Sequence, residues 1–384
     1  MESDRVARLF ELHRRPEHVV VGLMSGTSAD GVDAAVVRIG DSPSGVRIEL
    51  LTFVERPHAP DLRARILRAA TMQAAELAEL DFALGDAFAS AAREAIDRVK
   101  GRVDFVGSHG QTIVHVPRGS RARGATMQLG QAAIIAEVTG LPVVSDFRVR
   151  DMALGGEGAP LVPLVDHLVF AKPGERRVLL NLGGIANLTA VTGRLDDLIA
   201  FDAGPANALM DALIRESTQG AESCDRNGER AARGRVVPEL LARLLADPFL
   251  AQRPPRSADR DAYGTEQAKR ILASGHTVDD ALATAATFTV ECVARAIEFL
   301  PPAARPVDRV IASGGGTRNP TLMRLLRERL RVQVDTTDDH GVPSQAKEAI
   351  AFAILARQTI LGRPGNLERA TGASARTILG TITP

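Results

Sequence analysis

A polar glycine turn at residues 26–31 separates two short apolar runs, 19–24 and 32–39. Both runs are rich in valine, which predicts strands. The turn therefore joins two strands, whereas common nucleotide-binding loops lead from a strand into a helix. The backbone N–H groups and hydroxyls of such a turn can bind an anion such as a phosphate. An ordinary hairpin built from turn-forming residues explains the segment equally well.

A second glycine turn, 181–187, lies between two predicted strands of the second half of the chain. Glycine hairpins at matching positions of both halves are less probable by chance than a single one. Together the two hairpins could hold a polyphosphate from both sides. Asp30 and Asp33 could bind Mg²⁺ through water, because Mg²⁺ keeps much of its hydration shell, or they could simply stabilise the turn. A third glycine cluster, 313–319, follows a predicted strand, and we expect its backbone to lie against a nucleoside.

Two residues are candidates for proton transfer. Asp202 lies between a strand predicted at 198–201 and a helix predicted at 205–216, where a carboxylate can point into a ligand crevice. A helix N-cap explains Asp202 as well, and spacing alone favours the cap. His109 follows a strand predicted at 103–107 and could act as an acid, a base or a donor to substrate, although a single histidine is more often structural. The eight histidines show no metal-binding spacing, so no zinc site is expected.

The strands and helices predicted around these residues form two similar halves. In the first half, strands predicted at 19–24, 32–39 and 48–56 precede helical spacing over 62–100. The second half again begins with a strand, a glycine turn and a strand, and a duplicated α/β fold of this kind binds its ligand between its domains. We expect an N-terminal extension 1–18, a first domain 19–151, a second domain 152–365 and a C-terminal segment 366–384 that packs back on the first domain.

The glycine-rich segment 151–160 crosses the expected domain boundary. Glycine absorbs large changes of backbone dihedral angle, so this segment could be a hinge. A plain surface loop has the same composition, and both interpretations stay open.

The composition excludes several classes of protein. The chain has 384 residues, of which 45% are hydrophobic and 24% charged, with a formal net charge of zero. A globular protein of two domains is expected, and there is no basic field for nucleic acid or an anionic membrane. Aromatic residues make up only 3% and tryptophan is absent, which argues against base stacking. Cys224 and Cys292 form no disulfide framework, and no signal peptide or spanning run is present, so a cytoplasmic location is expected.

Together these segments resemble the anhydro-N-acetylmuramic acid kinases, a family of the actin-like sugar-kinase and heat-shock ATPase superfamily. The matching segments follow one another through nearly the whole chain: 22–33, 107–112, 146–151, 155–163, 181–187, 201–207, 314–316 and 366–380. The resemblance implies an α/β fold of two ribonuclease-H-like (actin-like ATPase) domains flanking a central cleft. It also implies ATP and Mg²⁺ as cofactors and a homodimer.

The resemblance implies a specific reaction. ATP phosphorylates the 6-oxygen of 1,6-anhydro-N-acetylmuramic acid while water opens the anhydro bridge, giving N-acetylmuramic acid 6-phosphate and ADP in the recycling of cell-wall sugars. Asp202 matches the general base of the family, which would deprotonate the water. A kinase of the same fold acting on another sugar, or a non-catalytic ATP-gated binding module, are the alternatives. A carboxylate at position 202 argues against the binding module, which needs no base.

The expected ligand contacts follow from the glycine segments and from the resemblance. The residues expected to bind ATP are Gly26, Thr27, Ser28, Ala29, Asp30, Gly31, Val32, Asp33, Gly183, Gly184, Gly314, Gly315 and Gly316. Thr112, Arg148 and Glu348 lie in segments that match substrate-facing parts of the family, and Arg148 would pair with the lactyl carboxylate through two N–H groups. No metal ligands are assigned. The chain departs from the family at 256–261, where members usually carry Lys-Ser-Thr-Gly-Arg-Glu.

Overall fold

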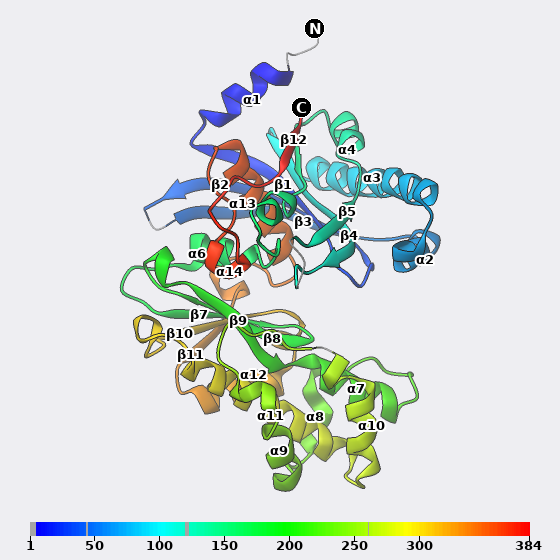
Figure 1. Cartoon of the computed structure of the whole chain (residues 1–384), viewed down its shortest axis with the longest axis vertical. Coiled ribbons are helices and arrows are strands. Elements are labelled where there is room, and N and C mark those ends of the chain that lie inside the picture. Colours follow the sequence, from blue (N-terminus) through cyan, green and yellow to red (C-terminus); the bar gives the residue numbers. More distant parts are fainter. Residues whose placement is uncertain (1–4, 44, 120–122, 260) are drawn as a thin grey trace. The chain divides into compact units, whose positions relative to one another are not determined.

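The computed structural model describes residues 5–43, 45–119, 123–259 and 261–384. The chain divides into two compact units (Figure 1). Unit 1 combines Met1–Val169 with Gly341–Pro384, and unit 2 is Phe170–His340. These bounds differ from the expected domains, because 152–169 and 341–365 pack within unit 1.

A seven-stranded sheet forms the centre of unit 1, in the order β12-β6-β4-β1-β2-β3 with β5 paired to β4. The first three strands are antiparallel, whereas β4 runs parallel to β1 and β6 parallel to β4. The C-terminal strand β12 pairs antiparallel with β6 at the edge of this sheet. The strands are β1 (Glu17–Ser25), β2 (Gly31–Ser42), β3 (Gly45–Pro57), β4 (Phe105–Val116), β5 (Ala125–Leu129), β6 (Val143–Ser145) and β12 (Thr381–Thr383).

Helices cover both faces of this sheet. Alternate residues of a strand point to opposite faces, and in β1 Val21 and Leu23 belong to the core cluster that includes Leu84 of α3, while Gly22 faces α13. The helices of unit 1 are α1 (Arg5–His13), α2 (Pro60–Arg68), α3 (Ala74–Asp97), α4 (Ala132–Thr139), α5 (Val149–Ala153), α6 (Val162–Phe170), α13 (Lys347–Ile360) and α14 (Glu368–Thr371).

Glycines in the sheet allow α13 to approach it closely. A side chain at Gly22 would overlap the carbonyl group of Ala349, and one at Gly107 would lie 2.6 Å from the Cβ atom of Ala356. Such distances are far below van der Waals contact, so only glycine fits there. This packing explains why 341–365 belongs to unit 1 and places the first turn of α13 near the glycine turn of β1 and β2.

Unit 2 repeats the strand order of unit 1. Its sheet has the order β11-β10-β7-β8-β9, with β7, β8 and β9 antiparallel and β10 and β11 parallel to β7. The expected α/β fold with two ribonuclease-H-like sheets is therefore confirmed. The strands are β7 (Arg177–Leu182), β8 (Ile185–Val191), β9 (Ile199–Pro205), β10 (Arg309–Ser313) and β11 (Gln333–Thr336).

The helices of unit 2 pack around the long helix α11, which contacts α7, α8, α9, α12 and β9. Thirteen of its residues are buried, many of them alanine, which allows neighbouring helices to approach closely. The helices are α7 (Asn207–Ser217), α8 (Glu229–Arg233), α9 (Pro238–Leu245), α10 (Thr265–Ala273), α11 (Val278–Glu298) and α12 (Pro320–Leu330). Among the described residues, no helix is both long and apolar enough to span a membrane.

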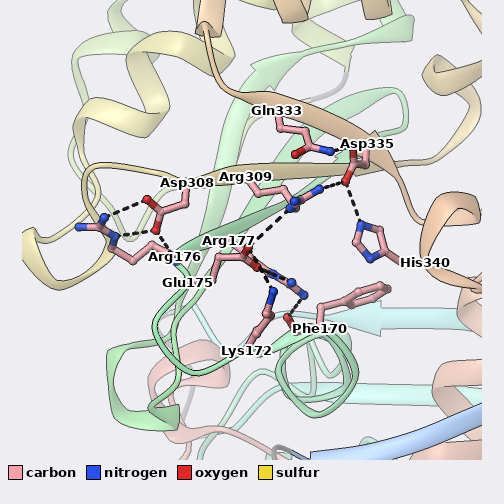
Figure 2. Close-up of polar contacts among 10 residues, drawn as sticks. All are labelled: Phe170, Lys172, Glu175, Arg176, Arg177, Asp308, Arg309, Gln333, Asp335 and His340. Carbon is pink, nitrogen blue, oxygen red and sulfur yellow. Dashed lines mark hydrogen bonds and ion pairs between the residues drawn. The ribbon is translucent and has the colours of Figure 1, made fainter.

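The first and last residues of unit 2 lie side by side (Figure 2). The ring of Phe170 meets the ring of His340 edge to face, with 6.2 Å between centroids, and the carbonyl of Phe170 accepts a hydrogen bond from Arg177. Ion pairs then connect the two ends through the sheet, by way of Arg177, Glu175, Arg309 and Asp335. The chain therefore enters and leaves unit 2 at one place.

Three expected elements differ from the structure. Strand β4 continues to Val116, well past the predicted end at 107, because it pairs there with the unexpected strand β5. Strand β9 continues to Pro205, which pairs with Ile185, so Asp202 lies inside a strand instead of after one. The glycine-rich segment 151–160 lies within unit 1, where buried Asp151 anchors it, so the segment does not mark the boundary between the units.

Candidate functional site

The first glycine turn joins β1 and β2, as predicted. Thr27 and Ser28 are exposed at its tip, whereas Ala29 and Val32 are buried. Ala29 has φ of 54°, a left-handed conformation that residues other than glycine seldom adopt. The turn therefore presents backbone and hydroxyl groups of two small residues on a rigidly packed base.

A buried polar group supports this turn from the sheet. The hydroxyl of Ser25 lies 2.7 Å from the carbonyl oxygen of Gly31 and 2.6 Å from Oε1 of Gln111. The amide of Gln111 donates to the carbonyl of Gly26 at 3.1 Å. These contacts close both ends of the turn, and Gln111 was not singled out from the sequence because its partners lie about 85 residues away.

The two aspartates of the turn have different surroundings. Asp30 is exposed and pairs with Arg63 at 3.3 Å. Burial, and then the charges of Glu55 and Glu348, raise the pKa of Asp33 to about 6. Asp33 is therefore a carboxylate that gains from a nearby cation, although no group of three potential metal ligands occurs among the described residues.

Arg148 and His109 form a pair beside the end of β1. Nε of Arg148 donates to Nε2 of His109 at 3.1 Å, and a terminal nitrogen lies 2.9 Å from the same atom. The other terminal nitrogen donates to the carbonyl of Gly158 at 2.8 Å. His109 therefore acts as an acceptor for an arginine, and this pairing argues against the acid, base or substrate-donor roles considered from its sequence position.

The loop that supplies the Gly158 carbonyl is held by Asp151. This fully buried carboxylate accepts hydrogen bonds from the Gly158 N–H at 2.8 Å, the Asn366 amide at 2.7 Å and the Thr371 hydroxyl at 2.6 Å. The C-terminal segment thereby fixes a loop that is in direct contact with Arg148. Asp151 was not identified from the sequence, since only the tertiary structure assembles its partners.

Glu348 and Thr112 belong to the same unit as Arg148. Glu348 lies in the first turn of α13, and desolvation raises its pKa more than the charges of Lys347 and Arg148 lower it. Thr112 lies in β4 and its hydroxyl accepts a 3.4 Å hydrogen bond from the amide of Gln128. Unit 1 thus contains the first glycine turn and all three residues expected to contact substrate.

In unit 2 the second and third glycine segments lie against each other. A side chain at Gly314 would come within 2.7 Å of the Asn181 side chain and 2.9 Å of Leu182, and Gly314 has φ of 85°. The carbonyls of Gly183 and Gly184 accept hydrogen bonds from the first N–H groups of α7. Gly316 is equally restricted, since a side chain there would lie 2.6 Å from the Cβ atom of Leu182.

Asp202 lies in β9, beside Asn187 of β8 in the sheet. Its Oδ2 accepts hydrogen bonds from the Ala258 N–H at 2.9 Å and from the Ser257 hydroxyl at 3.2 Å. Burial raises its pKa, and these two hydrogen bonds and the charge of Arg256 lower it by less. The alternative of a helix N-cap is wrong, because the N-cap of α7 is Ala206.

Arg256 holds the strand that carries Asp202. The side chain is buried, and its Nε donates to the Asp202 carbonyl at 2.8 Å while a terminal nitrogen donates to the Ala203 carbonyl at 3.2 Å. Its guanidinium also lies over three aromatic rings, those of Phe201, Phe249 and Phe299. The departure from the family run at this position therefore places a large, fully engaged cation behind the candidate base.

The chain is therefore an α/β protein of two ribonuclease-H-like units, with three glycine segments and a half-buried carboxylate, Asp202. The family model described as Anhydro-N-acetylmuramic acid kinase matches residues 18–384. The chain belongs to this family.

Relatives of the same name support the assignment. Anhydro-N-acetylmuramic acid kinase of Caldanaerobacter subterraneus subsp. tengcongensis is 40% identical over 394 residues, covering 98% of this chain and 99% of the relative. The protein of that name from Streptomyces coelicolor is 44% identical over 372 residues, covering 95% of this chain and 93% of the relative.

Among solved structures, an activator of 2-hydroxyisocaproyl-CoA dehydratase from Clostridium difficile with bound ADPNP is similar at a TM-score of 0.41 and 12% identity, covering 89% of this chain and 95% of that chain.

Proposed function

We propose that the chain is an ATP-dependent kinase of 1,6-anhydro-N-acetylmuramic acid, which opens the anhydro ring with water and phosphorylates O6 in cell-wall sugar recycling. The observation that carries the proposal is the environment of Asp202. One carboxylate oxygen is held by Ser257 and Ala258, and burial raises the pKa, as suits a general base. The name of the family and of its relatives supplies the sugar.

The proposed reaction balances around one water molecule. Asp202 accepts a proton from the water, whose oxygen forms a bond to the anomeric carbon. The bond from that carbon to the bridge oxygen breaks, and the freed oxygen, O6, attacks the γ-phosphorus of ATP. ADP leaves, and N-acetylmuramic acid 6-phosphate is the sugar product. The remaining demand on the protein is to position the reactants and stabilise charge.

Residues of unit 1 would bind the sugar and the phosphates. We assign the lactyl carboxylate to Arg148, since a guanidinium can offer two parallel N–H groups to a carboxylate. Glu348 and Thr112 would contact polar groups of the sugar. The exposed Thr27 and Ser28 would bind phosphate oxygens through N–H groups and hydroxyls.

Residues of unit 2 would bind the rest of the nucleotide. The backbone of Gly314–Gly316, which lies against Asn181 and Leu182 at the end of β7, would pack on the nucleoside. When bound, Mg²⁺ would neutralise charge on the phosphates, and it usually keeps several waters and needs few protein ligands. Asp33 is the carboxylate we assign to the hydrated ion, because Asp30 is paired with Arg63.

The test is product analysis in ¹⁸O-labelled water with ATP and the anhydro sugar. We expect mass spectrometry to find one label at the anomeric hydroxyl and none in the phosphoryl group, and to find no product with Asp202→Asn. Wild-type turnover by Asp202→Asn would refute the assignment of the base. Activity on sugars without an anhydro bridge would favour a kinase of another sugar, and ATP binding without turnover would favour a binding module.

Three further properties are proposed on narrower grounds. The family resemblance suggests a homodimer, which light scattering after size exclusion would show as twice the mass of 40.8 kDa. Dependence on ATP and two free cysteines, Cys224 and Cys292, support a reducing, cytoplasmic location. The zero net charge supports a small-molecule partner and not a nucleic acid.

A further inference from the structure

The two nitrogens of the His109 ring have defined roles. Nδ1 lies 2.9 Å from the carbonyl oxygen of Gly110, which can only accept, so Nδ1 carries the proton and donates. Among the described residues, Nε2 faces only N–H donors of Arg148, at 3.1 and 2.9 Å, so Nε2 carries the lone pair and accepts. The partners on both sides of the ring therefore select a single neutral tautomer.

The surroundings of the ring keep His109 in this form. The side chain is 2% exposed, and its ring packs at a tilt of 41° against the ring of Phe352 of α13, with 4.4 Å between centroids. Burial, and then the charge of Arg148, lower the pKa of His109 to about 3. A protonated Nε2 would direct a donor at a guanidinium, so the pair needs the neutral imidazole.

The protein uses only some of the hydrogen-bond donors of Arg148. An arginine has five N–H donors, and three hydrogen bonds are formed here, two to His109 and one to Gly158. Two N–H groups remain without a partner among the described residues, one on each terminal nitrogen. Because Gly158 is itself held by Asp151, the guanidinium is fixed on two sides and offers two donors in a set direction.

We propose that His109 is a positioning residue that orients Arg148 toward a carboxylate on the sugar, and that this orientation produces a preference for an anhydro amino sugar bearing a lactyl group. The proposal rests on the proposed function and deepens it. A two-pronged contact between a guanidinium and a carboxylate needs both groups coplanar, and an arginine free to rotate loses that geometry. Nε2 of His109 is a neutral acceptor, so it can hold the guanidinium of Arg148 in one orientation without neutralising the positive charge that attracts the substrate's carboxylate.

Two substitutions separate this role from plain packing. His109→Asn keeps a donor for the Gly110 carbonyl but has no acceptor that reaches Arg148. His109→Gln keeps a side-chain oxygen that can reach Arg148 and accept from it. His13→Gln, at an exposed histidine of α1 that contacts the Ile360 carbonyl, is the matched control. Thermal unfolding of each variant identifies any general loss of structure.

The measurement is kcat/KM for two anhydro amino sugars that differ only in the lactyl carboxylate. For wild type and His13→Gln we expect a strong preference for the sugar with the carboxylate. His109→Asn should reduce this preference by about tenfold or more, the size of one lost charge-assisted hydrogen bond, mainly by raising KM for the lactyl sugar. His109→Gln should keep most of the preference.

The outcomes distinguish the inference from the function on which it rests. If His109→Asn lowers kcat/KM equally for both sugars, or leaves the preference at its wild-type value, the positioning role is refuted while the kinase stands. A wild type that uses both sugars equally refutes the specificity in the same way. If the wild type phosphorylates neither sugar, the proposed function fails as well.

A double-mutant comparison provides the second arm. Arg148→Lys keeps the positive charge but removes the planar donor edge that His109 binds. If His109 acts through Arg148, adding His109→Asn to Arg148→Lys should change the preference by less than twofold. A further loss of tenfold would show that His109 acts independently of Arg148 and would overturn the proposal.

Discussion

Asp202 and Arg256 are joined through their main chains as well as through a side chain. The Asp202 N–H donates to the Arg256 carbonyl at 3.3 Å, and Nε of Arg256 donates back to the Asp202 carbonyl at 2.8 Å. The next two residues, Ser257 and Ala258, hold the carboxylate. A single short segment therefore fixes both the backbone and the side chain of the proposed base.

Removing the Arg256 side chain should weaken both the protein and its catalysis. Arg256→Ala leaves several carbonyls unpaired and removes three cation–π contacts, so we expect a loss of about 2–4 kcal/mol in the free energy of unfolding. Arg256→Lys keeps a positive charge among the rings but has fewer hydrogen-bond donors, so its free energy of unfolding should fall by less than that of Arg256→Ala. Urea unfolding and kcat of both variants check this. Equal stability of the wild type and the alanine variant would contradict it.

Ser257 should set the pH at which activity is lost on the acid side. The base works only when deprotonated, so activity falls as the pH drops through the raised pKa of Asp202. The Ser257 hydroxyl lowers that pKa, and Ser257→Ala should therefore move the acid limb of kcat/KM to higher pH. Ser217→Ala, at the end of α7, is the control and should leave the limb in place. A shift to lower pH with Ser257→Ala would contradict the assignment.

Asp33 should contribute to the binding of the metal-nucleotide complex. Burial, and then the charges of Glu55 and Glu348, disfavour ionised Asp33, and a bound cation would relieve this. Asp33→Asn should weaken binding of Mg²⁺-ATP by about three- to tenfold, in line with the modest strength of a contact made through water. Calorimetric titration at several Mg²⁺ concentrations measures it. Asp30→Asn, whose carboxylate pairs with Arg63, should have a smaller effect, and the reverse ranking would refute our choice of carboxylate.

Asp335 should stabilise the place where the chain enters and leaves unit 2 (Figure 2). Burial raises its pKa, but hydrogen bonds from Arg309, His340 and Gln333 outweigh burial and hold the pKa below the ordinary value. A carboxyl whose pKa is lower in the folded than in the unfolded state stabilises the folded protein at every pH above its unfolded pKa. This stabilisation is lost as the pH falls through the folded-state pKa. Asp335→Asn should therefore cost about 1–2 kcal/mol of unfolding free energy at pH 7.

The difference between Asp335→Asn and wild type should shrink as the pH falls below about 4, the ordinary value for an aspartate. Urea unfolding of both proteins at pH 7 and at a pH below about 4 measures this change in the free energy of unfolding. Asp86→Asn, at an exposed carboxyl on α3, is the control and should change stability little at either pH. A difference that stays constant with pH would mean that the ion pairs of Asp335 do not stabilise the folded chain.

Local sequence patterns predicted several elements of this fold correctly. Valine-rich runs and glycine turns predict the hairpins β1–β2 and β7–β8, and helical spacing over 62–100 predicts the region that forms α2 and α3. The end of β9 differs from the prediction, because a proline after a strand is typical of a helix start, whereas pairing with Ile185 extends the strand to Pro205. The sequence does not predict that 341–365 belongs to unit 1. The close packing of α13 on Gly22 and Gly107 involves residues far apart in the chain, which local patterns do not reveal.

The residue types at the candidate site, and the family through the order of its motifs, follow from the amino-acid sequence. Which side chains act together depends on how the folded chain packs. His109 and Arg148 are 39 residues apart, and Asp202 and Arg256 are 54 apart. Periodicity and turn chemistry act over a few residues, so they carry no information on such pairs. Those pairs form only when the packing of sheets and helices brings distant segments within hydrogen-bond distance.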